Sequence, residues 1–327
     1  FETFNEPVRQ GWSQVLKPYH TQMVSTIRQH SQNVIVMGTR TWSQEVDEAA
    51  SDPVQGDNLA YSLHFYVGTH KQDLRNKAAA ALSRGVCVFA SEWGIWNQGG
   101  GPAVDYGEVR AWNDFLAQEG ISSANWAIND KAEPASALKP GASSHGSWSD
   151  GELTEAGRLV RDDLRKGSGP TPGPTTTTTP APIPDPVAPA GSPVAAHGHL
   201  RVSGSRLLDG AGQPVRLQGM SLFWSQWGGK YWNADALRWL RDDWRVSLVR
   251  AAMGVEAGGY LQNPEAELAR VETVVNAAVE LGLYVLVDWH EENAERHLAQ
   301  AKGFFGKVAE KYGHLPNVLF ETFNEPV

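Results

Sequence analysis

The chain begins and ends with the same eight residues. FETFNEPV occupies positions 1–8 and occurs again at positions 320–327. An identical octamer at both termini is very improbable by chance, and the two copies compete for one place in a single fold. We therefore expect a circular permutant, in which one copy completes a fold that starts inside the chain. The alternative is a slice of a tandem array of identical units, and the sequence does not separate these two origins.

A second segment, 167–193, is interpreted as a linker. It would connect the two residues that form the chain termini in the unpermuted fold. Between Pro170 and Pro193 it holds nine Pro and six Thr. Such a composition gives an extended, semi-rigid linker with nothing to bury. The natural order then starts after the linker, runs through 194–327 (strands 1 to 4), and continues through 1–166 (strands 4/5 to 8). Both parts are expected to form one domain.

In this restored order, short apolar runs alternate with helical patterns. The runs are rich in β-branched and other apolar residues, as expected of strands that are buried on both faces. Strands that alternate with helices predict parallel βα units. The eight runs lie at 215–219, 246–253, 283–289, 318–320, 34–37, 60–66, 86–90 and 123–127.

Helix boundaries support the same pattern. Asn263 is expected to cap a helix that has Pro264 at its first position and Gly282 at its end. Glycine also ends three further expected helices, at 70–84, 106–119 and 294–312. Eight units fit an α/β fold, a (β/α)8 TIM barrel, circularly permuted and opened at strand 4. A doubly wound open sheet is the alternative, but no Gly-rich phosphate loop such as GxGxxG is present.

The composition excludes several classes of protein. Hydrophobic residues make up 41% of the chain and charged residues 20%, which permits a packed core. The net charge is −9, so neither nucleic acid nor a membrane is expected as a partner. Cys87 is the single cysteine, so no disulfide framework is expected. Thirteen Trp are many, and they favour a ligand with a flat, apolar face.

In a barrel of this kind, functional residues sit at the carboxyl ends of the strands. Glu92 follows the seventh strand, and Glu325, or its duplicate Glu6, follows the fourth. Two carboxylates that flank one bond are typical of glycoside hydrolysis. Arg250, at the second strand, can hold one carboxylate ionised while the other stays protonated. Aromatic residues at the same rim can stack on the apolar faces of sugar rings.

Each of these residues has a plainer explanation when taken singly. A lone Glu at a strand end is usually a solvated charge, and a lone Arg or His usually belongs to the scaffold. The convergence of polar and aromatic residues at most strand ends favours a shared site instead. A metal site is not predicted, because His290, Glu291 and His297 lack the HExxH spacing.

The strand-end segments resemble glycoside hydrolase family 5, and most of all its bacterial endo-β-1,4-glucanases. The resemblance covers nearly the whole chain except the linker, in family order once the permutation is undone. It implies a secreted cellulase that cleaves internal β-1,4-glucosidic bonds of cellulose and related β-glucans with retention and without a cofactor. The matching segments are GMSLFWSQW, LVRAAM, VDWH, FETFNEP, VMGTRTWSQ, SLHFYVGTH, FASEWG and NWAINDK.

The resemblance also implies the roles of individual residues. Glu92 matches the nucleophile, and Glu325 or Glu6 matches the acid/base. Asn324, or its copy Asn5, matches the residue that binds the 2-hydroxyl of the sugar being cleaved. Residues that orient the carboxylates or hold that sugar are matched by Arg250, His64, Tyr66 and His290. The remaining substrate contacts are expected from Trp126 as a stacking platform, Lys131, Glu133, Trp42 and Trp224.

Only one copy of the octamer can fill strand four. Residues 317–320 lead without a break into 321–325, so the C-terminal copy keeps the strand covalently whole, and we favour Glu325 over Glu6. Residues 1–8 are then displaced or lent to a neighbour as a swapped strand in an oligomer. Secretion is expected from a polymeric substrate, although no signal peptide opens the chain.

Other functions remain open at this point. Within the enzyme class, a mannanase or a xyloglucanase on the same fold is the runner-up. A carbohydrate-binding protein made inactive by the permutation belongs to a different class. A third alternative is a fragment of a repeat array that is active only when a neighbour donates strand four.

Overall fold

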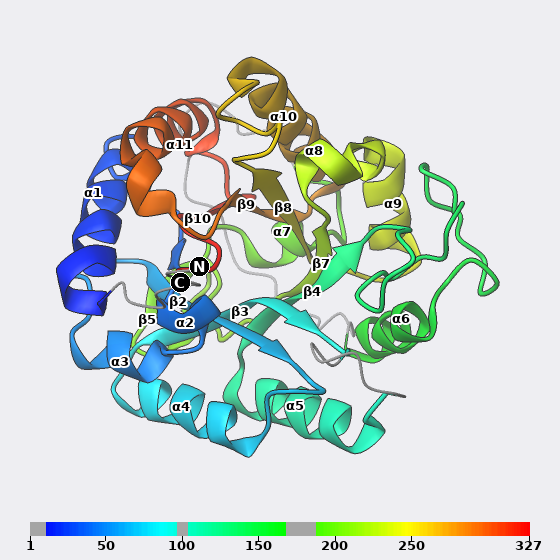
Figure 1. The fold of residues 1–327 in the computed structure, drawn as a ribbon, viewed down its shortest axis with the longest axis horizontal. Helices are drawn as coiled ribbons and strands as arrows, with labels where there is room; N and C mark the ends of the chain where they lie inside the picture. Colours follow the sequence, from blue (N-terminus) through cyan, green and yellow to red (C-terminus); the bar gives the residue numbers. More distant parts are fainter. Residues whose placement is uncertain (1–10, 97–103, 168–187) are drawn as a thin grey trace, which may run out of the picture.

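The computed structural model describes residues 11–96, 104–167 and 188–327. Eight parallel strands form a closed barrel, and helices surround it (Figure 1). The order around the barrel is β7, β8, β9, β10, β1, β2, β3 and β4, and β4 pairs with β7 to close it. The expected (β/α)8 barrel is confirmed, and the open doubly wound sheet is wrong.

Every expected buried run lies in or overlaps a barrel strand, with ends shifted by a few residues. The barrel strands are β1 (Ile35–Met37), β2 (Leu59–Tyr66), β3 (Cys87–Gly94), β4 (Ser122–Ile128), β7 (Gln218–Leu222), β8 (Leu248–Gly254), β9 (Tyr284–His290) and β10 (Val318–Glu321). A separate antiparallel pair consists of β5 (Arg201–Ser203) and β6 (Arg206–Leu208).

The helices follow the strands as the pattern predicted. They are η1 (Trp12–Leu16), α1 (Lys17–Ile27), α2 (Arg40–Ser43), α3 (Val46–Ser51), α4 (Gln72–Ser83), α5 (Tyr106–Glu119), α6 (Glu155–Gly167), α7 (Pro193–His197), α8 (Ser225–Gly228), η2 (Gly229–Tyr231), α9 (Ala234–Asp242), α10 (Pro264–Leu281), η3 (Ala294–His297) and α11 (Leu298–Tyr312). The helix expected over 294–312 is thus divided into a 3₁₀ turn and α11.

At helix α10, one predicted helix boundary is confirmed and the other is wrong in part. Gly282 adopts a left-handed conformation with φ of 69° and ends the helix, as expected. The prediction for Asn263 is wrong in part. It occupies the N-cap position, but its side chain accepts no hydrogen bond from the helix. Its amide instead donates to the Gly258 carbonyl at 2.9 Å, because the preceding loop turns back toward it.

Alternation along the strands divides the interior into two layers. On β9, Val285, Val287 and Trp289 pack outward against the helices, while Tyr284 and Leu286 point into the barrel. Most of the tryptophans belong to such packing rather than to a ligand site. The buried ones outside the strand-end site are Trp12, Trp93, Trp112, Trp148, Trp232, Trp244 and Trp289.

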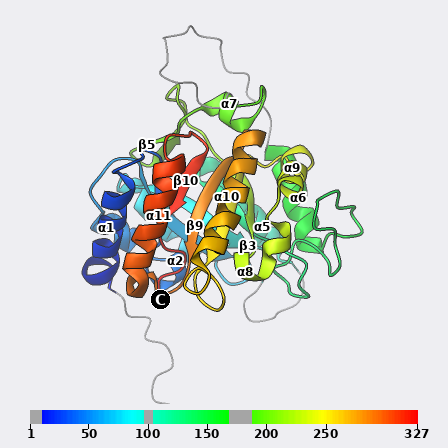
Figure 2. The same cartoon turned by 90° about the horizontal axis from the view of Figure 1, so that it is seen from above.

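The amino-terminal end of the barrel is closed by apolar side chains. Leu207 of the β5–β6 pair and Val194 of α7 join the inward-facing Leu248 and Leu319 in one buried cluster. Figure 2 shows α7 and β5 at the end of the molecule opposite the chain's C-terminus. Ser192, inside the expected linker range, caps α7 by accepting a hydrogen bond from Ala195. These contacts close the barrel interior at its amino-terminal end, so the interior positions that remain open to a ligand lie at the carboxyl end.

Helix α1, near the start of the described chain, packs beside the last strand. Strand β10 pairs in parallel with β1, with Phe320 opposite Ile35. The Tyr19 hydroxyl of α1 donates to the Thr322 carbonyl at 2.8 Å. Helix α1 also lies next to α11 in both views (Figures 1 and 2). Segments from opposite ends of the chain are thus neighbours in one barrel wall.

Candidate active site

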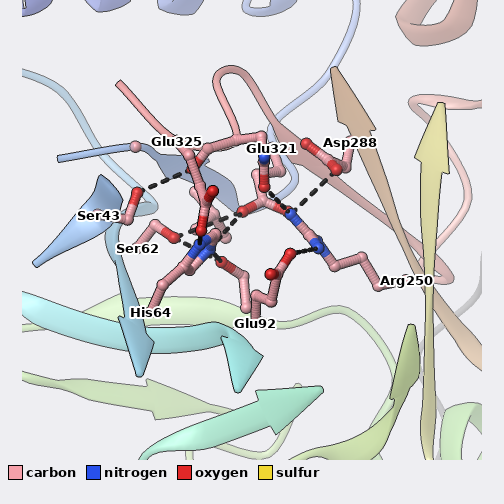
Figure 3. Close-up of polar contacts among 12 residues, drawn as sticks. Ser43, Ser62, His64, Glu92, Arg250, Asp288, Glu321 and Glu325 are labelled. Carbon is pink, nitrogen blue, oxygen red and sulfur yellow. Dashed lines mark hydrogen bonds and ion pairs between the residues drawn. The ribbon is translucent and has the colours of Figure 1, made fainter. Parts of the chain in front are cut away.

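Two glutamates face each other at the carboxyl end of the barrel (Figure 3). Glu92 lies on β3, and Glu325 follows β10. One carboxylate oxygen of each, together with a ring nitrogen of His64, lie within 4.8 Å of one another. Glu92 is 3% exposed, and the side chain of Glu325 is 17% exposed. The pair is therefore largely shielded from water, with Glu325 the more accessible member.

Backbone contacts hold Glu325 in place although it is close to the end of the chain. The Glu325 N–H donates to the Glu291 carbonyl, and the Ser43 hydroxyl donates to the Asn324 carbonyl at 2.8 Å. The Trp42 N–H donates to the Pro326 carbonyl at 2.9 Å. The C-terminal copy of the octamer thus occupies the barrel. Asn5 and Glu6 of the other copy lie outside the described residues.

Arg250 is fully buried between the carboxylates and uses all three guanidinium nitrogens. Its Nη1 donates to Glu92 at 2.8 Å, and its Nε donates to Glu321 at 2.7 Å. Its Nη2 donates to the Asn324 side-chain oxygen at 2.6 Å and lies 3.0 Å from Asp288. The guanidinium therefore fixes the orientation of the nucleophile candidate and of the Asn324 amide together.

His64 connects to the other glutamate. Its Nδ1 is 2.9 Å from Glu325, and its Nε2 is 2.9 Å from the Ser91 hydroxyl. The Tyr66 hydroxyl donates to Glu92 in a short hydrogen bond. Gly94 allows the Tyr66 ring to approach, since a Cβ there would lie 2.6 Å from a ring carbon. A larger residue at position 94 would push the hydroxyl away from Glu92.

The surroundings drive the pKa values of the two glutamates apart. Burial and the charge of Glu92 raise the pKa of Glu325 to about 7, although the contact with His64 lowers it. Burial also opposes ionisation of Glu92, but the charges of His64 and Arg250 outweigh it and hold its pKa below the usual value. Near neutral pH, Glu92 is therefore ionised while Glu325 retains a large protonated fraction.

The two histidines of the site differ in charge. Burial would lower the pKa of His64, but the adjacent carboxylates of Glu321 and Glu325 raise it to about 9. Burial and the nearby Arg250 lower the pKa of His290 to about 3. His64 is thus a cation and His290 a neutral ring, whose Nδ1 lies 2.6 Å from Asp288.

Aromatic side chains form one wall beside the carboxylates. Trp126 stacks on His290 with ring centres 5.0 Å apart and planes within 5° of parallel. Trp224 meets the same histidine edge-on at 4.1 Å. Trp227 lies next to Trp224 and is 57% exposed, the most exposed tryptophan of the described residues. This wall offers apolar faces to a ring-shaped ligand.

The outer residues of the prediction are spread more widely. Lys131 and Glu133 form an ion pair at 2.9 Å beyond β4, and the Lys131 ammonium lies 4.6 Å from the Phe223 ring centre. Trp42, on α2, lies on the other side of the mouth, near Glu325, and the described contacts link it to the site through its backbone. The structure thus brings the catalytic candidates together, with these three residues around them.

Comparison with known proteins identifies the family. The family model for cellulase, glycosyl hydrolase family 5, matches residues 1–132 and 208–327. This chain belongs to glycosyl hydrolase family 5. Endoglucanase Z of Dickeya dadantii (strain 3937) is 43% identical over 166 residues, which cover 50% of this chain and 37% of the relative. An endoglucanase of Clostridium saccharobutylicum is 42% identical over 168 residues, covering 50% and 37%.

Solved structures include similar chains as well. The catalytic domain of Thermobifida fusca endoglucanase Cel5A is 36% identical, with a TM-score of 0.42 over 42% of this chain and 46% of that one. The family 5 chain described here spans little more than a third of the two curated relatives named above. None of the helices in the described parts of the chain is long and apolar enough to cross a membrane.

The sequence analysis gave no role to several residues of this site. Asp288 and Glu321 lie within the buried network around Arg250, and Ser91 contacts His64. The two-residue period of a strand is the signal that could have found Asp288 and Glu321. Leu286, Asp288 and His290 point to the same face of β9, and Leu319 and Glu321 point to the same face of β10. Trp227 lies three positions after Trp224, and its exposure in the structure is what distinguishes it from the buried tryptophans.

Two groups of described side chains have the composition of a metal site. One is the trio of His64, Glu92 and Glu325, and the other consists of Glu256, Glu291 and His297. In the second, Glu291 accepts a hydrogen bond from the Trp289 indole at 2.8 Å and pairs with His297. Hydrogen bonds within the protein engage His64 and Glu92 in the first group and Glu291 and His297 in the second, and the absence of a metal remains our prediction.

Proposed function

We propose that this chain is a retaining endo-β-1,4-glucanase. The observation that carries the proposal is the pair of glutamates within 4.8 Å, one ionised and one with a raised pKa. In retaining enzymes the two carboxyl groups lie about 5–5.5 Å apart, whereas inverting enzymes need a wider gap for a water molecule. The printed names of the relatives, endoglucanases, support the choice of substrate.

The proposed reaction has two displacements. Glu92 attacks the anomeric carbon while Glu325 gives its proton to the leaving glycosidic oxygen, which forms a covalent glycosyl-enzyme. Glu325, now ionised, then takes a proton from water, and this water releases the sugar from Glu92. Arg250 and Tyr66 hold the Glu92 carboxylate in position between these steps.

The remaining predicted residues bind the substrate in this proposal. Asn324 has its side-chain oxygen on Arg250, which directs the amide nitrogen toward a sugar hydroxyl. Trp126 and His290 form the floor under the sugar that is cleaved. Trp224, Trp42, Lys131 and Glu133 contact sugars farther along the chain. We infer secretion from the polymeric nature of such a substrate.

A product profile tests the proposal. The chain is incubated with carboxymethylcellulose, barley β-glucan, mannan and xyloglucan, and the anomeric form of the first product is followed by NMR. We expect a rapid fall in the viscosity of carboxymethylcellulose and a β-configured first product. Preferred cleavage of mannan or xyloglucan would replace the substrate assignment. Binding without cleavage of any of these would indicate a carbohydrate-binding protein, and an α-configured product would indicate inversion.

We also propose that the barrel is a circular permutant of the family order. The family match falls into two segments, 208–327 and 1–132, and α1 packs on the segment after β10 through Tyr19 and Thr322. The test is a rearranged chain with 194–327 placed before 9–166 and the linker omitted. We expect it to fold as a monomer with the same products. A rearranged chain that folds but is inactive would contradict the proposal.

A swapped strand is the proposed alternative use of the octamer at residues 1–8. If this octamer completes the barrel of a neighbouring chain, size-exclusion chromatography will show a dimer that disappears when residues 1–8 are deleted. Activity that falls on dilution would show that the neighbour's strand is required. A monomer with concentration-independent specific activity would rule out such exchange.

A further inference from the structure

Glu321 is a third buried carboxylate at the active site, and its exposure is 0%. It ends β10, four residues before Glu325, and its neighbours across the sheet are Asp288 on β9 and Val36 on β1. Figure 3 shows it on the inner side of the barrel, between Arg250 and His64. Because no solvent reaches it, Glu321 cannot contact a polysaccharide, and its partners must explain its presence.

Those partners are the two cations that serve the catalytic glutamates. Its Oε2 accepts a hydrogen bond from Arg250 Nε at 2.7 Å. Its Oε1 lies 3.7 Å from His64 Nε2 and accepts a weak contact from the Ser62 hydroxyl at 3.4 Å. Glu321 therefore touches the arginine that holds Glu92 and approaches the histidine that contacts Glu325.

The contact with Arg250 fixes how the guanidinium is turned. A guanidinium has donors along a rigid planar fork, so a partner on Nε determines where the two Nη groups point. With Nε on Glu321, Nη1 points at Glu92 and Nη2 at Asn324. Without the carboxylate at position 321, the fork is free to swing toward Asp288, and the hold on Glu92 weakens.

The contact with His64 provides a countercharge. Several polar or charged groups lie around this histidine: Glu321 and Glu325 from β10 and its continuation, Ser91 and Glu92 from β3, and Asp288 and His290 from β9. Arg250 of β8 pairs with the same Glu92 and Glu321. The Glu321 carboxylate, whose Oε1 lies 3.7 Å from His64 Nε2, favours the charged ring. Glu325 cannot replace it, because Glu325 has to alternate between protonated and ionised forms.

We propose that Glu321 is a positioning residue that holds Arg250 against the nucleophile and keeps His64 charged beside the acid/base. This inference rests on the proposed function for the roles of Glu92 and Glu325. It makes one buried carboxylate the common support of both halves of the reaction. A change there is expected to alter turnover much more than substrate binding, because the residue does not touch the sugar.

The test compares Glu321→Gln with the wild type in two measurements. The first is the titration of His64 by NMR on histidine-labelled protein, with the signal assigned through a His64→Gln variant. We expect the midpoint to move from about 9 to a value lower by about one pH unit or more. The second is steady-state kinetics, where we expect kcat to fall about a hundredfold with KM within about twofold.

A matched control is available on α10. Glu267 is also buried, at 1% exposure, and pairs with Arg270 rather than with any residue of the site. Glu267→Gln therefore introduces the same buried amide away from the reaction. We expect it to leave both kcat and the His64 titration unchanged, whatever it does to thermal stability.

A second variant keeps the test decisive if Glu321→Gln does not fold. Glu321→Asp retains the charge but withdraws it by one methylene, so we expect His64 to titrate close to the wild-type midpoint while kcat falls about tenfold. An unchanged His64 midpoint in Glu321→Gln, or wild-type kcat in either variant, would overturn the inference. The titration needs no substrate, so a chain that proved not to cleave β-glucans would refute the proposed function alone.

Discussion

The two ends of the barrel are built from the same strands but have opposite chemistry. At the amino end, inward-facing Leu248 and Leu319 meet Leu207 in a sealed apolar cluster. Two residues farther along the same strands, at the carboxyl end, the inward positions are Arg250 and Glu321. One step of the strand alternation, about 7 Å, separates a hydrophobic core from a buried ionic network.

This difference shows how the fold supports the site. Buried charges cost free energy unless each is paired, and here Arg250 and His64 face Glu92 and Glu321. The apolar end does the opposite, since it gains free energy from burial and carries no chemistry. We therefore expect substitutions at the carboxyl end to affect catalysis most and substitutions at the amino end to affect stability most.

The largest effect is expected at the catalytic carboxylates. Glu92→Gln removes the nucleophile but keeps its shape, so kcat is expected to fall on the order of a thousandfold or more while cello-oligosaccharides still bind. Steady-state kinetics and isothermal titration calorimetry measure the two quantities. More than a tenth of the wild-type kcat in this variant would refute the assignment.

Glu325→Gln and Glu6→Gln form the matched pair for the acid/base. We expect the first to abolish activity on cellulose and the second to leave it intact, because the C-terminal copy occupies the barrel. Activated aryl glycosides, whose leaving groups need little protonation, should rescue the first step in Glu325→Gln. If Glu6→Gln alone is inactive, the N-terminal copy is the working one; if neither single change abolishes activity, the copies are interchangeable.

The second effect tests the apolar end. Leu207→Ala removes a side chain that is 3% exposed beneath the barrel, and we expect a loss of about 2–5 kcal/mol in the free energy of unfolding. Urea denaturation measures this loss, and kinetics at a temperature where the variant is folded measures kcat. A kcat changed by more than about twofold would show that the two ends are coupled.

At the carboxyl end, the pH dependence separates the effect on catalysis from the effect on stability. With the pKa of Glu325 raised to about 7, kcat/KM is expected to fall about tenfold per pH unit above that value. The raised pKa of His64 stabilises the fold fully below its ordinary value of 6.5, and this contribution is lost as the pH rises through about 9. Activity should therefore decline before stability does, and coincident declines in kinetics and urea titrations would contradict this.

The smallest effects are expected along the aromatic wall. Trp126→Ala removes a ring that stacks on His290 inside the site, so we expect a higher KM and a lower kcat, with a binding loss on the order of 1 kcal/mol. Trp227→Ala removes an exposed ring and should raise KM a few-fold without changing kcat. Equal effects of the two variants on kcat would contradict the expectation that the contribution of the wall to turnover decreases with distance from the carboxylates.

Much of this architecture was predictable from sequence patterns. Each buried run became a barrel strand or part of one, because a short run of β-branched residues that is buried on both faces is typical of a parallel strand covered by helices. Glycines at positions 120 and 282 ended helices, since both adopt the left-handed conformation that glycine tolerates best. The capping role of Asn263 was not predictable, because it depended on a loop that turned the amide toward Gly258.

The sequence by itself determined the barrel, its family and the two candidate glutamates, since these follow from local patterns and motifs. Only the tertiary structure decided which octamer occupies β10 and which side chains meet around Arg250. Ser62 and Glu321 are 259 positions apart, and His64 and Glu325 are 261 apart. A register shift in β3 between Ala90 and Trp93 also lets neighbouring Ser91 and Glu92 both serve the site. Such contacts arise only when the barrel closes, because closure brings the ends of the chain into adjacent strands.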